Sequence, residues 1–289
     1  VFDTTNVAVD HNQLTMEIMK KVADKHDLVC LLHEKPFEGI NGSGKHNNWS
    51  MITDDGVNLL DPGKTPSENI QFLVFLMAVI KAVDEYADLL RISVASAGND
   101  HRLGANEAPP AVVSIFLGDE LTEVLKSIEN DTYFTSHGAV QMDIGATVLP
   151  HFVKDNTDRN RTSPFAFTGN KFEFRMLGSA ASVANPNIVL NTAVAEALDQ
   201  FAKELDGVAP EDMEHAVHEL IKRAIKKHKR VIFNGNGYTD EWIEEAEKRG
   251  LYNLKSTPDA LPMWIAQKNI DLFTKHSIFT SEELHSRYE

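Results

Sequence analysis

The sequence predicts an α+β protein whose last third is mainly helical. Two segments, 46–52 and 171–176, alternate polar and apolar residues with the period of two that is typical of strands. A run from 67 to 92 has an apolar first half, so we expect a central buried helix with Ser67 as its cap. With 289 residues, the chain is long enough for one large domain or two small ones.

The first elements are expected to be a helix and a short strand. Residues 12–26 place an apolar residue at every fourth position among charged residues, which is the pattern of an amphipathic helix. The apolar segment 28–32 is short and is followed by Pro36, which favours a strand. Cys30 lies within this segment, so we expect it to be an inert core residue.

A glycine-rich loop at 39–44 leads into the strand at 46–52, which a turn ends. The alternation in this strand places His46, Asn48 and Ser50 on one polar face.

Beyond the central helix, we expect a polar loop at 93–107, a helix at 119–129 and a long irregular stretch at 131–170. The strand at 171–176 then turns its aromatic positions to one side and its charged positions to the other. The charged face carries Lys171, Glu173 and Arg175.

The last third contains four expected helices with recognisable start signals. Pro186 and Pro210 lie near two of the starts, and Thr239 is placed to cap a third helix. The four ranges are 186–205, 210–229, 239–249 and 259–276.

Composition excludes several classes of protein. The net charge of −15 repels phosphate backbones and anionic headgroups, which argues against nucleic acid and membrane partners. The longest apolar stretch, Ile70 to Val83, is too short to cross a bilayer. A single cysteine suits the reducing cytoplasm, where we expect this protein to be. The start at Val1, without an initiator methionine, suggests a fragment of a longer chain.

The segment 39–46 nearly matches a phosphate-binding P-loop, with His46 in place of the hydroxyl residue. A P-loop must open a helix, whereas the residues that follow alternate like a strand, so this interpretation is disfavoured.

A longer match is much more specific. Lys35-Pro36, then Asn41-Gly42-Ser43-Gly44, then His46 and Ser50, resemble the ATP-region signature of glutamine synthetases. The segments 32–37, 44–50 and 99–110 look specifically like those of type III glutamine synthetases, and the resemblance covers essentially the whole chain.

The resemblance implies a catalytic-domain fold with a curved, mostly antiparallel sheet backed by helices. It implies that 1–289 is part of that domain, with 206–289 a mainly helical type III extension, and that an N-terminal domain and a C-terminal continuation lie outside this chain. The implied reaction is ligation of ammonia to L-glutamate, driven by ATP, through γ-glutamyl phosphate. The parent protein is then expected to be a homo-oligomer of stacked rings, and the fragment alone to be inactive.

The resemblance also assigns a metal site and a nucleotide site. His46 matches a histidine ligand of the metal that bridges the nucleotide phosphates, and Glu173 matches a carboxylate that shares this metal. A hard Mg²⁺ or Mn²⁺ ion suits such ligands. Ser50 matches a nucleotide contact. Lys171 stands where many relatives carry arginine and Asn48 where many carry a second histidine, and both are expected to lie at the nucleotide. The family's further glutamate ligands have no counterpart in 1–289, so this metal site is expected to be incomplete here.

The remaining assignments concern glutamate and the transferred phosphoryl group. Asn41 and Gly42 match the loop that holds the amino end of glutamate, and Arg102 matches the arginine that grips its carboxylate. The catalytic residues implied are Glu107, which takes a proton from ammonium, and the phosphate-facing Arg161 and Arg175.

Other interpretations remain open from the residues alone. A non-catalytic glutamine synthetase-like binding or structural protein is the alternative function. Without the resemblance, Glu173 could simply pair with Lys171 or Arg175 on the strand surface. His215 and His218 could chelate a metal but are typical of a solvated helix, and the basic run 222–230 favours a structural role or an oligomer contact.

Overall fold

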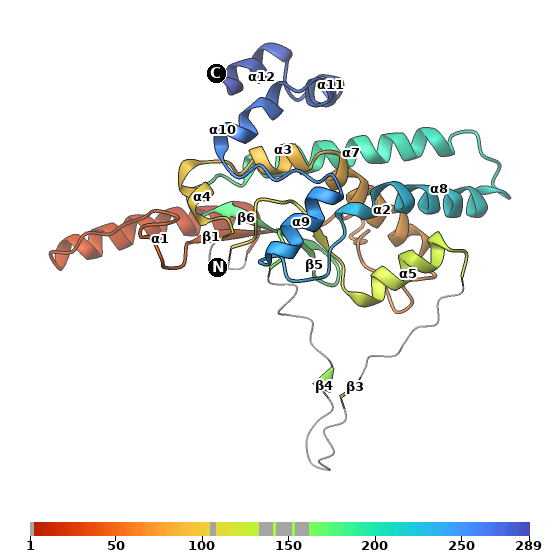
Figure 1. Ribbon diagram of the computed structural model, residues 1–289, viewed down its shortest axis with the longest axis horizontal. Helices are drawn as coiled ribbons and strands as arrows, with labels where there is room; N and C mark the ends of the chain where they lie inside the picture. The colour runs from red at the N-terminus through yellow and green to blue at the C-terminus, as the bar shows by residue number, and fades with distance from the viewer. Residues whose placement is uncertain (1–2, 105–107, 133–140, 143–151, 154–161) are drawn as a thin grey trace.

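The computed structural model of the protein describes residues 3–104, 108–132, 141–142, 152–153 and 162–289 (Figure 1). Within these residues, helices surround a small central sheet, so the α+β class that the sequence predicts is confirmed. None of the described helices combines the length and the apolar character needed to cross a membrane.

The central sheet has four strands in the order β1-β6-β5-β2. The β1–β6 and β5–β6 pairs are antiparallel, and the β2–β5 pair is parallel, so the sheet is mixed but mostly antiparallel. The strands are β1 (Gly44–Trp49), β2 (Ile115–Phe116), β5 (Phe165–Phe167) and β6 (Phe172–Gly178). A separate two-stranded pair joins β3 (Gln141–Met142) to β4 (Phe152–Val153).

The strand β6 has the two faces that its alternation predicts. The side chains of Phe172, Phe174 and Met176 are completely buried. Phe172 stacks on Phe165 of β5 at 4.8 Å between ring centroids, which fixes the two strands through aromatic packing. The opposite face is left for Lys171, Glu173 and Arg175.

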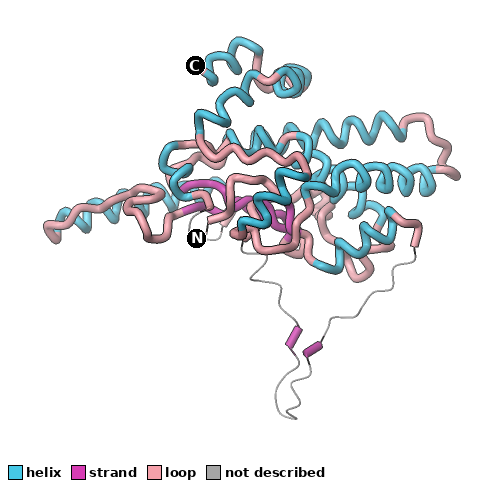
Figure 2. The backbone as a smooth tube through the Cα atoms, in the orientation of Figure 1, coloured by secondary structure: helices cyan, strands magenta, loops and turns pink. Residues whose placement is uncertain are grey.

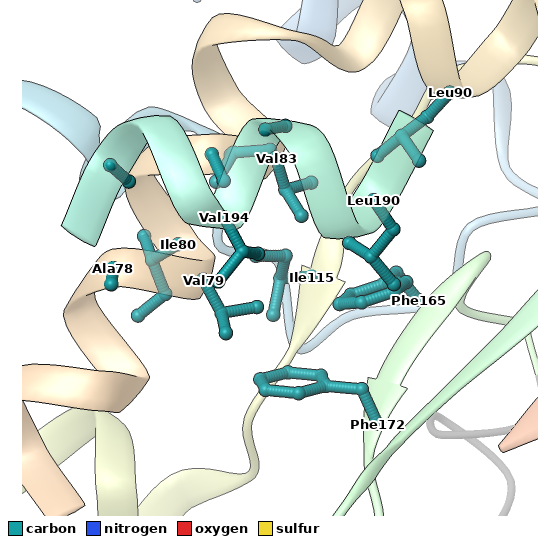
Figure 3. Packing of buried hydrophobic residues seen from close by; sticks show 14 of the residues in the cluster. Ala78, Val79, Ile80, Val83, Leu90, Ile115, Phe165, Phe172, Leu190 and Val194 are labelled. Carbon is teal, nitrogen blue, oxygen red and sulfur yellow. The ribbon is translucent and has the colours of Figure 1, made fainter. Parts of the chain in front are cut away.

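The helix α2 (Ile70–Glu85) forms the centre of the core, in agreement with the predicted central helix. It packs against α7 (Ala184–Leu205) and α8 (Met213–His228), and α7 lies above the sheet (Figure 2). Figure 3 shows Val79, Val194, Ile115 and Phe172 meeting between α2, α7 and the sheet. This packing holds β5 and β6 in place beneath the helices.

The remaining helices follow the chain. They are α3 (Ala87–Ile92), α4 (Ala97–Arg102), α5 (Asp119–Glu129), η1 (Lys229–Val231), α9 (Asp240–Lys248), α10 (Thr257–Ala260), η2 (Leu261–Ile265), α11 (Gln267–Lys275) and α12 (Ser281–Tyr288). The predicted helix at 119–129 is confirmed as α5, and the predicted Thr239 cap is confirmed because its hydroxyl accepts from Trp242 N.

Several predicted boundaries are wrong. Asn69, not Ser67, caps α2, because its side chain accepts from Phe72 N. The expected single helix ends at Tyr86 and restarts as α3, and the expected loop at 93–107 contains α4, capped by Ser96.

The expected helix at 259–276 is divided into α10, η2 and α11, because Pro262 has no amide hydrogen for a continuous α-helix. The sequence prediction also missed α12, although Thr280 and Glu283 form a complete capping box at its start.

The predicted strand at 28–32 is also wrong. These residues form no strand, and Leu28, Val29 and Leu31 are 64%, 85% and 59% exposed. Cys30 is only partly buried rather than a core residue. An apolar run becomes a buried strand only when a neighbouring strand accepts its hydrogen bonds, and none pairs with it among the described residues.

The helix α1 (Thr5–Lys25) begins earlier than the predicted 12–26 and projects from the body of the molecule (Figure 1). It has no buried residue, and its predicted apolar stripe is exposed, including Leu14 at 58% and Ile18 at 50%. The helix is amphipathic as predicted, but no described element packs against its apolar face.

Candidate functional site

The candidate site lies on the polar face of the β1–β6 pair. Asn48 on β1 is directly opposite Glu173 on β6, so the two side chains share one face. His46 lies two residues before Asn48, and Arg175 two residues after Glu173, so both belong to that same face. Four of the predicted site residues are therefore brought together by one strand pair.

A β-bulge shapes this face next to His46. Lys45 pairs with Leu177 and Asn47 pairs with Phe174, so the single residue His46 faces two residues of β6, Arg175 and Met176. A strand that carries an extra residue bends and redirects its side chains.

His46, Glu173 and Arg175 form a hydrogen-bonded series. Nδ1 of His46 lies 2.7 Å from Oε1 of Glu173. The other carboxylate oxygen accepts from Nε of Arg175 at 2.9 Å and from Nη2 at 2.5 Å. The His46 side chain is 56% exposed, whereas Glu173 and Arg175 are 16% and 10% exposed. The series thus runs from a buried guanidinium to an imidazole that is open to solvent.

This arrangement keeps Glu173 ionised. The hydrogen bond from His46, followed by the hydrogen bond and charge of Arg175, lowers the pKa of Glu173 to about 2 against the opposing effect of burial. An ionised carboxylate only accepts hydrogen bonds, so Nδ1 of His46 carries the hydrogen in this contact. In neutral His46, Nε2 then keeps its lone pair.

The donor set fits a divalent cation. A carboxylate and an imidazole are suitable ligands for Mg²⁺ or Mn²⁺. Adjacent ligands of an octahedral ion with bonds of about 2.1 Å are separated by about 3 Å, close to the 2.7 Å between these two donor atoms. His46 and Glu173 could therefore bind one ion if it replaced the hydrogen they share.

The residues assigned to nucleotide contact lie along and beyond this face. Asn48 is exposed beside Glu173. The Ser50 hydroxyl lies 2.7 Å from Oδ1 of Asn58 and 3.1 Å from the carbonyl of Asn170. Lys171 lies two residues before Glu173, at the start of the same strand face.

The residues assigned to glutamate lie at the other end of β1. Asn41 is exposed in the loop, and a Cβ at Gly42 would be 2.8 Å from both Cγ of Arg102 and the carbonyl of Glu34. A Cβ at Gly44 would be 2.0 Å from Nη2 of Arg102. Only glycine lets this loop lie so close to the arginine, so the glycines in the motif have a steric purpose.

Arg102 is buried beneath that loop, with only 4% of its surface exposed. Its guanidinium donates to Oδ1 of Asn99 at 3.1 Å and, at 3.4 Å, to the carbonyls of Met176 and Arg175. Burial lowers the pKa of Arg102, and the negative charge of Glu34 opposes this effect. Arg102 therefore binds the backbone carbonyl of Arg175, whose side chain belongs to the candidate site.

Sequence reasoning missed Glu34 and Asn99, which interact with Arg102, and Lys45, which lies at the end of the loop. Glu34 is 5% exposed and Asn99 is completely buried. The sequence carries no clear signal for them, because Glu34 and Lys45 are two of several charged residues that flank the glycine-rich motif.

Two predicted catalytic residues, Glu107 and Arg161, lie outside the described residues. The P-loop interpretation is wrong, because the segment after Gly44 is the strand β1 rather than a helix.

Comparisons with known proteins agree with the motif. Residues 1–113 match the family model "Glutamine synthetase, catalytic domain", and residues 216–289 match "Glutamine synthetase C-terminal domain". A glutamine synthetase of Butyrivibrio fibrisolvens is 62% identical over 294 residues, which cover 100% of this chain and 41% of that protein. A type-3 glutamine synthetase of Dictyostelium discoideum is 55% identical over 290 residues and is covered to 40%.

Among solved structures, one titled "Apo GmaS without ligand" aligns at 18% identity with a TM-score of 0.42, over 84% of this chain and 49% of that one. The chain spans about two fifths of the length of the curated relatives it matches. The two family matches and the high identity along the whole chain show that it is homologous to part of the glutamine synthetases, with a type III member among its relatives.

Proposed function

We propose that the whole protein is a glutamate–ammonia ligase that makes L-glutamine from L-glutamate, ammonia and ATP. Homology to part of the glutamine synthetases supports the reaction class. The observation that carries the proposal is the hydrogen-bonded series of His46, Glu173 and Arg175, because it combines potential metal ligands with a cation on one face.

The reaction needs ATP because a carboxylate is a poor electrophile. Transfer of the γ-phosphoryl group to the side-chain carboxylate of glutamate gives γ-glutamyl phosphate and ADP. Ammonia then attacks the acyl carbon, and phosphate leaves to give glutamine. The protein contributes mainly position and charge neutralisation in such a phosphoryl transfer.

The described residues have separate roles in this proposal. Arg175 faces the transferred phosphoryl group, and its guanidinium offsets negative charge on the phosphate oxygens. Arg102 and the loop at Asn41 and Gly42 hold glutamate. Ser50, Asn48 and Lys171 bind the nucleotide. Glu107 and Arg161 complete the catalytic set as a proton acceptor and a phosphate contact.

His46 and Glu173 would hold a magnesium or manganese ion. When bound, such an ion neutralises the charge of the nucleotide phosphates and orients them. The geometry supports this role, because Nδ1 of His46 and Oε1 of Glu173 lie 2.7 Å apart on the same strand face.

We also propose that the whole protein is a homo-oligomer of stacked rings located in the cytoplasm, and that 206–289 is a mainly helical type III extension of the catalytic domain. The single cysteine supports a reducing compartment. Light scattering of the full-length protein tests the oligomer.

The proposed function is tested by release of phosphate from ATP by the full-length protein, with glutamate, ammonium and divalent metal omitted in turn. Activity should need all of them, and Glu173→Gln should lower it by about a hundredfold or more. Glu123→Gln is the control, since that carboxylate lies on the exposed side of α5 in a pair with Lys126. A wild type that consumes no ATP with any metal would instead favour the non-catalytic alternative.

A further inference from the structure

The carboxylate of Glu34 is buried at the base of the glycine-rich loop, outside every role assigned above. Only 5% of Glu34 is exposed. A Cβ at Gly98 would be 2.6 Å from its Oε2, and a Cβ at Gly178 would be 2.7 Å from its Oε1. The carboxylate therefore fits only because Gly98 and Gly178 have no side chains. Burying a charged carboxylate costs free energy unless hydrogen bonds or an opposite charge compensate it.

Glu34 closes the loop in two ways. Its carbonyl accepts from Ser43 N at 2.7 Å, which joins the two ends of the loop. Its carboxylate oxygen Oε1 accepts from Ala180 N at 3.2 Å, in the turn that follows β6. The start of the loop is thereby attached to the end of the strand that carries Glu173 and Arg175.

Lys45 attaches the other end of the loop to the same turn. Its Nζ donates to the carbonyls of Ser179 at 2.6 Å and Ala181 at 2.7 Å. Glu34 and Lys45 thus have opposite charges and hydrogen-bond successive backbone groups of the turn at 179–181: the amide of Ala180 and the carbonyls on either side of it. We call this arrangement, formed by Glu34, Lys45 and the turn at 179–181, the loop clamp.

The negative charge of Glu34 also acts on Arg102, which is buried under the same loop. Arg102 is bound by Oδ1 of Asn99, and a Cβ at Gly178 would lie 3.1 Å from that oxygen and 2.7 Å from Oε1 of Glu34. The carboxylate thus offsets part of the cost of burying the guanidinium. Its loss would leave Arg102 buried with less compensation.

We propose that Glu34 is a positioning residue that, through the loop clamp and its charge beside Arg102, holds the glutamate-binding loop and Arg102 in the geometry needed for substrate. This inference rests on the proposed function for its substrate. It separates Glu34 from the residues that touch glutamate, because Glu34 acts through Arg102 and through the loop at Asn41 and Gly42.

Steady-state kinetics of the full-length protein test the proposal. Glu34→Gln keeps the shape of the side chain but removes its charge, and should raise KM for glutamate about tenfold or more. The values of kcat and of KM for ATP should stay within about twofold, because only binding of glutamate is affected. Glu34→Asp keeps the charge with a shorter reach, and should give an intermediate KM for glutamate.

Asp88→Asn is the matched control, because Asp88 is a completely buried carboxylate that binds Lys268 and Asn269 in another part of the molecule. This variant should lose stability without a change in KM for glutamate. An unchanged KM in Glu34→Gln, or an equal rise in Asp88→Asn, would overturn the positioning role.

Amide hydrogen exchange gives a readout that needs no activity. The amides of 37–43 should exchange about tenfold faster in Glu34→Gln than in the wild type, with those of α2 unchanged, whereas Asp88→Asn should leave 37–43 unchanged. Unaltered exchange at 37–43 would refute the loop clamp. If the wild type consumed no ATP, the proposed function would fail, and exchange alone would still decide whether the loop clamp exists.

Discussion

Replacing Glu173 with glutamine should remove a part of the protein's stability that depends on pH. Glutamine keeps the size of the side chain and one oxygen acceptor, but it has no negative charge. In the wild type, the carboxylate accepts from both His46 and Arg175, and these contacts hold its pKa at about 2 instead of the ordinary 4.5. The variant tests whether the series of hydrogen bonds exists as described.

The magnitude follows from this difference in pKa. Each unit corresponds to about 1.4 kcal/mol, so the depression corresponds to about 3 kcal/mol. We reduce this to about 2 kcal/mol, because the His46 side chain is more than half exposed and water screens its interaction. Since the pKa is lower in the folded state, the stabilisation is fully present above pH 4.5 and is lost as the pH falls toward 2.

The assay is urea unfolding of the full-length protein in metal-free buffer at several values between about pH 2.5 and 6. The difference in free energy of unfolding between wild type and Glu173→Gln should be about 2 kcal/mol at the upper end and should shrink toward the lower end. Glu123→Gln, in an exposed ion pair, should differ from wild type by less than about 1 kcal/mol. A Glu173→Gln difference that stays constant with pH would refute the reasoning.

Three further predictions concern packing. Gly44→Ala should cost about 1–3 kcal/mol in urea unfolding, because its Cβ would meet both Arg102 and the carbonyl of Leu177; an unchanged midpoint would contradict the close approach. Phe172→Ala should cost about 3–5 kcal/mol in the same assay and Phe172→Leu clearly less, since the ring is completely buried; equal costs would argue against the aromatic stack. In residues 1–289, amides of α1 should exchange at least about a hundredfold faster than those of α2, because α1 has no buried residue; equal protection would show that α1 is covered.

Features that depend on local periodicity were predictable from the sequence. The alternation at 171–176 places Phe172 and Phe174 in the core because neighbouring side chains of a strand point to opposite faces. The same reasoning places His46 and Asn48 together on β1. The motif then identified the polar face of this strand pair as a candidate site before any geometry was known.

Features that depend on distant partners were not predictable. The segment 28–32 has the composition of a strand, yet a strand forms only where another strand supplies hydrogen-bond partners. The bulge opposite His46 could not be predicted either, because the alternation within each strand does not give the register between the two strands. Glu34 looks like an ordinary loop carboxylate until the fold brings Gly98 and Gly178 against it.

The bulge explains why both halves of the candidate site can use a single strand. Up to the first residue of the bulge, Arg175, β6 presents polar side chains on this face: Glu173 contacts His46, and Arg175 contacts Glu173. From the second residue of the bulge onward, Met176 and Leu177 are both buried, so β6 has no further polar side chain to offer. From Arg175 onward the strand contributes backbone groups instead: carbonyls at 175 and 176 accept from Arg102, and the turn at 179–181 receives Glu34 and Lys45. A single shift in register therefore divides β6 into a segment whose side chains form the proposed metal and phosphate face and a segment whose backbone supports the proposed glutamate loop.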